Sequence, residues 1–186
     1  MPRKSTAASK LKPVPATAPP PLVPVATMEK LIGIAMSRGA EFGEVYVEHT
    51  TTTAITLDEG KIKSSQVGIS QGVGIRAVNG SQVGYAYSDD LDNAALERTA
   101  ATAALIASGT RDPGPISVVR SAAPMHYALA QSPAAASLTI KVAFLNRGDK
   151  AARKFDPRIR QVMGSYVDQE KRIAVASSLG RYSEDR

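Results

Sequence analysis

The chain has 186 residues, with 23 Lys and Arg against 17 Asp and Glu, and it contains no cysteine and no tryptophan. This length is sufficient for one domain with a substantial core and a small appendage. The lack of cysteine excludes disulfides and thiolate metal sites, and without a secreted disulfide framework we expect a cytoplasmic protein.

Residues 1–27 are expected to form a disordered leader, because they combine proline, alanine and lysine without a hydrophobic period. Prolines interrupt every apolar run, so the segment does not have the form of a secretory signal. Its four basic residues and lack of acids are compatible with binding to nucleic acid or anionic lipid. No aromatic residues alternate with the lysines, which favours a solvated tail.

A first helix is predicted to be capped by Thr27, because Met28, Leu31, Ile32 and Ala35 share one face at helical spacing. Gly39 is expected to end this helix.

Residues 44–88 are predicted to form a β-meander of five short strands, because apolar and polar residues alternate along them. Asp58–Gly60 and Asn79–Gly80 supply the turn signals. With Asn79–Gly80 as a two-residue turn, Gly74 would pair with Tyr85, and an aromatic ring would lie over bare backbone.

Arg76 would then share a face with Val83 and Tyr85. Two interpretations stay open for it. It is either solvated on a half-exposed sheet or, if covered, held by a carboxylate, a carbonyl or an aromatic ring.

A second helix is predicted after the meander, ending at Gly109, with a stripe rich in small residues that suits close packing on a sheet. The stripe consists of Leu91, Ala95, Thr99, Thr102 and Ile106.

Residues 110–132 contain three prolines and are expected to form a long loop. Ser132–Pro133 is expected to start a helix that carries Leu138, Val142 and Leu145. Asp149 is expected to cap a further short helix. From Arg158 onwards, alternation predicts a hairpin with its turn at Asp168–Glu170.

The expected fold class is therefore α+β, with an antiparallel β-meander packed against helices and a second, C-terminal hairpin.

No catalytic template is recognisable. His49 and His126 are isolated from each other, whereas zinc catalysis needs three ligands. Asp89–Asp90 precedes a helix, where carboxylates commonly stabilise the helix dipole. No G-x-S-x-G motif is present. We therefore assign no catalytic and no metal-binding residues, and the substrate-binding residues remain unknown.

Four stretches of the chain resemble one family, the TldD/PmbA (modulator of DNA gyrase) metalloproteases. They are RGAEFGEVYVEHT, LDEGKIKSSQ, QGVGIRAVNGSQVGYAYSDDLDNAALERTAATAALIASG and FDPRIRQVMGSYVDQEKRIAVASSLG. The third is the most specific, since it joins a G-V-G-x-R strand, a turn and a G-[FY]-A-x-[ST] strand to an alanine-rich helix. The resemblance covers residues 28–186.

The resemblance implies an α+β N-terminal domain followed by a β-rich domain that holds zinc through an H-E-x-x-x-H motif. Residues 28–186 correspond to the N-terminal domain, so zinc is expected only in the second domain and no cofactor in this chain. The implied role is a scaffold and substrate-access domain in proteolysis of peptides or unfolded proteins, inactive alone. The implied partner is a TldD/PmbA-type subunit, in a dimer.

Two alternatives remain. The chain could be a non-catalytic interaction module that docks on a full-length relative through its sheet edge or its alanine-rich helix. It could also be a basic nucleic-acid-binding protein, given its net charge of +6.

Overall fold

The computed structural model describes residues 21–109, 114–120 and 131–186. The expected leader lies mainly outside these residues. Within the described part, Val23 is buried and helix α1 (Val25–Met36) begins before Thr27. Thr27 therefore lies in the first turn and is not the cap, and no side chain caps this helix.

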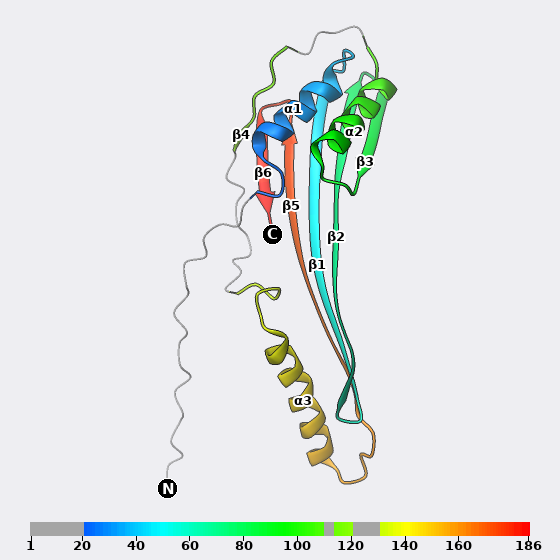
Figure 1. Cartoon of the computed structure of the whole chain (residues 1–186), viewed down its shortest axis with the longest axis vertical. Helices are drawn as coiled ribbons and strands as arrows, with labels where there is room; N and C mark the ends of the chain where they lie inside the picture. Colours follow the sequence, from blue (N-terminus) through cyan, green and yellow to red (C-terminus); the bar gives the residue numbers. More distant parts are fainter. Residues whose placement is uncertain (1–20, 110–113, 121–130) are drawn as a thin grey trace.

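The expected α+β fold class is confirmed, with helices on one face of a six-stranded sheet (Figure 1). The sheet order is β3-β2-β1-β5-β6-β4, and all neighbours are antiparallel except β4 and β6. The strands are β1 (Phe42–Asp58), β2 (Lys61–Asn79), β3 (Gln82–Ser88), β4 (Val119–Arg120), β5 (Met163–Ser177) and β6 (Arg181–Asp185).

The meander contains three strands, two of them long, where the sequence predicts five short ones. The turn at Asp58–Gly60 is confirmed, with positive φ at Glu59 and Gly60. The second turn is displaced, since Asn79 pairs with Gln82 and the two turn residues are Gly80 and Ser81. The predicted register of β2 and β3 is therefore wrong by two residues.

Helix α2 (Asn93–Ile106) packs on β3 and α1 through alanines, as the small-residue stripe predicts, but the stripe is rotated. Thr102 and Ile106 are exposed, and the buried side is Ala95, Leu96, Thr99, Ala100, Ala103 and Ala104. A Cβ atom on Gly84 would collide with the carbonyl oxygen of Ala103. This glycine is what allows the helix backbone to approach β3.

The C-terminal part departs from the prediction in two ways. Helix α3 (Leu138–Phe155) is one continuous helix, and its N-cap is Ser137 instead of Ser132. Asp149 lies inside it, buried and paired with Arg153 at 2.9 Å. Strand β5 runs without a turn through Asp168–Glu170, so the hairpin predicted there is wrong. A C-terminal hairpin is formed instead by β5 and β6.

The core lies where α1 and α2 cover the sheet, and it includes Leu31, Ile32, Val45, Val47 and Ile75. Beyond it, β2, β1 and β5 extend as a three-stranded arm (Figure 1). Helix α3 covers the same face of this arm, over the buried Ile55 and Leu57. No helix among the described residues is long and apolar enough to cross a membrane.

Candidate interaction and substrate-access surface

His49 lies in strand β1, opposite Gln71 of β2 on one side and Arg172 of β5 on the other. His126 lies outside the described residues. Within residues 21–109, 114–120 and 131–186, no group of three or more His, Cys, Asp or Glu is placed to hold a metal ion.

The carboxylates before α2 organise the start of that helix. The amide of Ala94 donates to Asp92 Oδ2 at 3.1 Å, which makes Asp92 the N-cap. The amide of Asp92 in turn donates to Asp90 Oδ1 at 2.9 Å. These bonds satisfy backbone groups at the start of the helix. The N-cap is Asp92, and not Asp89 or Asp90, the pair expected to act at this helix start.

The sheet has one face that no described element covers, and this face carries a tyrosine surface. We use this name for Tyr46, Tyr85 and Tyr87 together with Gly74. Tyr87 is 79% exposed and Tyr85 is 58% exposed. A Cβ atom on Gly74 would lie 2.6 Å from the Tyr85 hydroxyl, so the ring lies over bare backbone as predicted. The direct partner of Gly74, however, is Tyr87.

A charged network adjoins the tyrosine surface on β1 and β5. The hydroxyl of Tyr46 donates to Glu48 Oε2 at 2.7 Å, and Lys171 Nζ lies 2.6 Å from the same oxygen. Hydrogen bonds from Lys171 and Tyr46 lower the pKa of Glu48, while burial and the bond to Glu48 raise the pKa of Tyr46. Glu48 is therefore held as a carboxylate, which suits recognition of a donor better than uptake of a proton.

Arg76 contacts both a carboxylate and an aromatic ring, two of the kinds of partner expected for it. Its Nη2 atom lies 3.1 Å from Glu44 Oε1, and its guanidinium lies 5.5 Å from the centre of the Phe42 ring. Its side chain remains 45% exposed. It shares a face with Tyr85, its direct partner in β3, as the sequence predicts.

A buried lysine under α3 is a feature that the sequence analysis missed. Lys141 Nζ lies 2.8 Å from Asp168 Oδ2 and donates to Thr53 Oγ1 at 2.9 Å. Its side chain is only 4% exposed. The sequence does contain a signal for this burial, because Lys141 lies three residues after Leu138 and four before Leu145, within the apolar stripe of α3. The contact fastens α3 to both β1 and β5.

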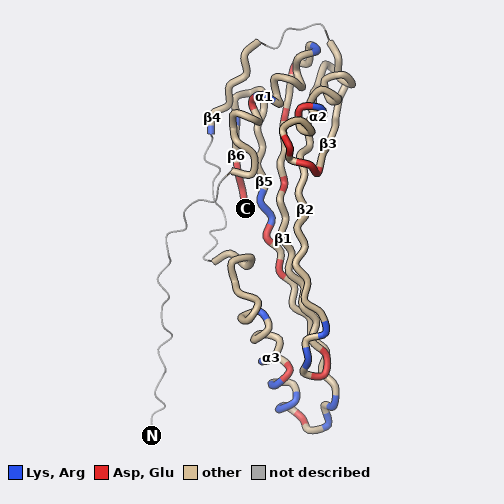
Figure 2. The backbone as a smooth tube through the Cα atoms, in the orientation of Figure 1, with Lys and Arg blue, Asp and Glu red and all other residues tan. Residues whose placement is uncertain are grey.

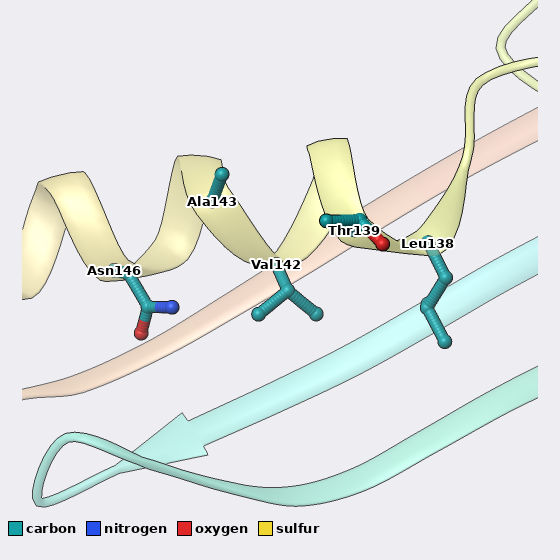
Figure 3. A pocket seen from close by; sticks show the side chains of 5 residues that line it. All are labelled: Leu138, Thr139, Val142, Ala143 and Asn146. Atoms are coloured by element: carbon teal, nitrogen blue, oxygen red, sulfur yellow. The ribbon is translucent and has the colours of Figure 1, made fainter.

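A hollow of about 380 Å³ opens on α3 beside these contacts (Figure 3). It is lined by Leu138, Thr139, Val142, Ala143 and Asn146. Leu138, Val142 and Asn146 point to the side on which the strands of the arm run. No charged side chain lines it, so it offers no group for acid–base chemistry.

The free end of the arm is basic, as Figure 2 shows where the β1–β2 turn approaches the end of α3. The side chain of Gln161 donates to Asp58 at 3.1 Å, and the amide of Glu59 donates to the carbonyl of Val162, which join the two segments. Residues 58–63 and 147–160 together hold eight Lys and Arg against four Asp and Glu.

Solved structures identify the class of this fold. One neighbour, described as a modulator of DNA gyrase from Thermotoga maritima, matches with a TM-score of 0.66 and 15% identity, over 86% of this chain and 36% of that one. Another, TldE from Thermococcus kodakarensis, matches with a TM-score of 0.60 and 20% identity, over 85% of this chain and 37% of that one. The chain therefore shares the α+β fold of these two proteins.

Sequence comparison identifies the family. Residues 43–107 match PmbA/TldA metallopeptidase domain 1, and residues 131–186 match the PmbA/TldA metallopeptidase central domain. The chain belongs to the PmbA/TldD metallopeptidase family, as its motifs suggested. A metalloprotease TldD homolog from Haemophilus influenzae is 26% identical over 163 residues, which are 86% of this chain and 33% of the relative. The chain thus spans about a third of the length of this curated relative.

Proposed function

We propose that this chain is the scaffold and substrate-access part of a TldD/PmbA-type zinc metalloprotease that acts on peptides or unfolded proteins. Zinc and the catalytic groups belong to the part of such a protease that these 186 residues do not include. The chain alone binds extended peptide and does not cleave it. Its working partner is a TldD/PmbA-type subunit.

The observation that carries this proposal is that both family segments build one continuous sheet. Domain 1 supplies β1, and the central domain supplies β5. These two strands pair from Glu44–Ser177 to Asp58–Met163 without interruption. A ladder of this length holds the two segments in a fixed relation, which is the property a scaffold requires.

The tyrosine surface supports the substrate-access role. Tyr85 and Tyr87 offer apolar rings with polar ends, and Glu48 and Lys171 offer an acceptor and a donor beside Tyr46. An extended peptide presents apolar side chains and free backbone groups. The tyrosine rings can contact its apolar side chains, and Glu48 and Lys171 can hydrogen-bond its backbone groups.

Binding of a fluorescently labelled unfolded casein peptide, followed by anisotropy, tests this role. We expect Tyr85→Ala and Tyr87→Ala together to weaken binding at least tenfold, because both rings are removed from the proposed contact. Phe155→Ala is the matched control, since Phe155 is 88% exposed at the far end of α3. Equal binding by the double variant and the wild type would contradict the proposal.

The interaction module remains the second candidate function, and one observation favours its sheet-edge form. The alanine-rich helix α2 uses its small residues against β3 and α1, so this side is not available for docking. Strand β2, in contrast, has a long edge that no described strand covers. Capture of a full-length TldD-type relative by the wild type, and its loss when this edge is altered, would support docking.

A further inference from the structure

Helix α3 carries apolar side chains on two of its sides. One side packs on the arm. The other consists of Ile140, Phe144, Ala151 and Phe155, and we call it the α3 stripe. These residues are four, seven and four positions apart, which places them along one flank of the helix. Ile140 is 51% exposed, Phe144 55% and Phe155 88%, so this flank faces solvent.

The exposed charges of α3 are all basic. Arg147, Lys150 and Lys154 are exposed and lie beside the α3 stripe. The guanidinium of Arg147 lies 4.6 Å from the centre of the Phe144 ring. Within the described part of the chain, none of these three cations has an ion-pair partner. The one acid of the helix, Asp149, is buried and already held in an ion pair.

The turn at the free end of the arm adds two more cations. Lys61 and Lys63 are exposed and follow this turn. A Cβ atom on Gly60 would lie 3.7 Å from Asp149 Oδ2, so the turn lies next to the last turns of α3. Basic residues of both segments gather at this end of the molecule (Figure 2). The region is therefore a row of exposed apolar side chains bordered by positive charge.

We propose that the α3 stripe binds the surface of an anionic lipid bilayer, with α3 lying in the plane of the interface. A helix with aromatic and aliphatic side chains along one flank and cations beside them has the composition of an interfacial helix. The apolar side chains enter the acyl boundary, while the lysine and arginine side chains reach the anionic headgroups. Lipid binding goes beyond the proposed function and does not depend on it.

The apolar part of this surface favours a bilayer over a nucleic acid, the other anionic partner that such charges suit. Nucleic acids are bound by cations along the phosphates and by aromatic rings that stack on bases. Ile140 offers no such ring, and the α3 stripe continues along about four turns of the helix. A bilayer removes this whole flank from water, whereas a phosphate backbone does not.

Tryptophan fluorescence tests the contact directly, because the chain contains no native tryptophan. We expect the emission of Phe155→Trp to shift to the blue when vesicles of phosphatidylglycerol and phosphatidylcholine in equal parts are added, because the ring leaves water. Vesicles of phosphatidylcholine alone should cause no shift. Leu105→Trp is the matched control, since Leu105 is 59% exposed on α2. An equal shift in both variants would overturn the proposal, as would no shift in Phe155→Trp.

Co-sedimentation with the same anionic vesicles measures what the apolar side chains contribute. We expect Phe144→Gln with Phe155→Gln to weaken binding at least tenfold, because both rings lose their place in the acyl boundary. Leu105→Gln with Ile106→Gln is the control, since these side chains are also more than half exposed but lie on α2. The control should bind as the wild type does.

A pair of charge reversals measures what the cations contribute. We expect Lys150→Glu with Lys154→Glu to weaken vesicle binding at least tenfold. Arg98→Glu with Arg181→Glu changes the net charge by the same amount at two exposed sites away from α3, and it should have little effect. Binding of the wild type should also fall as the salt concentration rises.

Two further outcomes would overturn the proposal. Vesicle binding that persists in the phenylalanine variant would place the contact elsewhere, as in the basic residues 1–27. Binding to a DNA duplex that requires Lys150 and Lys154 but neither phenylalanine would identify a nucleic acid as the partner. The vesicles contain no peptide and every variant keeps the tyrosine surface, so failure of lipid binding is distinguishable from failure of the proposed function.

Discussion

The close contact between Gly84 and the backbone of α2 sets the distance between this helix and strand β3. Gly84 lies directly under the carbonyl of Ala103, which leaves no room for a side chain. We expect Gly84→Ala to destabilise the protein by about 2 kcal/mol, because the helix must move away from β3. Urea unfolding followed by circular dichroism measures this. Gly68→Ala is the control, since open space surrounds Gly68, and an equal loss in both variants would contradict this packing.

The ion pair beneath α3 gives a pH-dependent contribution to stability. Burial alone would raise the pKa of Asp168, but hydrogen bonds from Lys141 and Tyr166 outweigh it and lower the pKa. The pKa of an Asp in the unfolded chain is about 3.9. Stability from this carboxylate is therefore complete above about pH 4 and is lost as the pH falls through the lower, folded pKa.

We expect Asp168→Asn to cost about 3 kcal/mol at neutral pH, because it leaves Lys141 buried without a counter-charge. The difference between wild type and variant should shrink as the pH falls below 4. Urea titrations at several pH values measure it, with Asp89→Asn as the exposed control. A difference that does not change with pH would contradict this role.

At the scale of elements, α3 is one helix although its sequence suggests two. Gly148 followed by Asp149 looks like a stop and a new cap, but Asp149 instead pairs with Arg153 one turn later. Gly148 has helical neighbours on both sides and open space where a Cβ atom would be.

We therefore expect Gly148→Ala to stabilise the protein by about 0.5–1 kcal/mol, since alanine loses less conformational entropy in a helix interior. Thermal unfolding measures this change. Destabilisation would instead indicate a helix boundary at this glycine.

Local sequence pattern was sufficient to predict a turn between strands but not the full length of the strands. The turn at Asp58–Gly60 was predictable, because glycine next to two acids is a local signal. The continuity of β5 was not, because Asp168 and Glu170 look like turn residues until Lys141 and Arg186 are known to face them. The length of β1 was also not predictable, because the run Thr50–Thr53 breaks the alternation of apolar and polar residues. In the structure these threonines continue the strand and pair with Ser70, Ile69, Gly68 and Val67 of β2.

At the scale of the whole molecule, the motifs of residues 28–186 were sufficient to predict the family and the α+β class. They were not sufficient to predict the candidate surfaces. The tyrosine surface and the uncovered edge of β2 depend on which face the helices cover and where β3 ends, and both follow from pairing between distant segments. Tyr85 over Gly74 was the one part of the surface available from sequence, through cross-strand pairing of large and small residues.

The central claim is that this chain supplies scaffold and substrate access without the catalytic groups. The most direct test is incubation of the chain with a labelled unfolded peptide and zinc, following binding by anisotropy and cleavage by mass spectrometry in the same sample. We expect binding without cleavage, and no effect of a chelator. Robust hydrolysis that the chelator abolishes would contradict the account, as would the absence of any peptide binding.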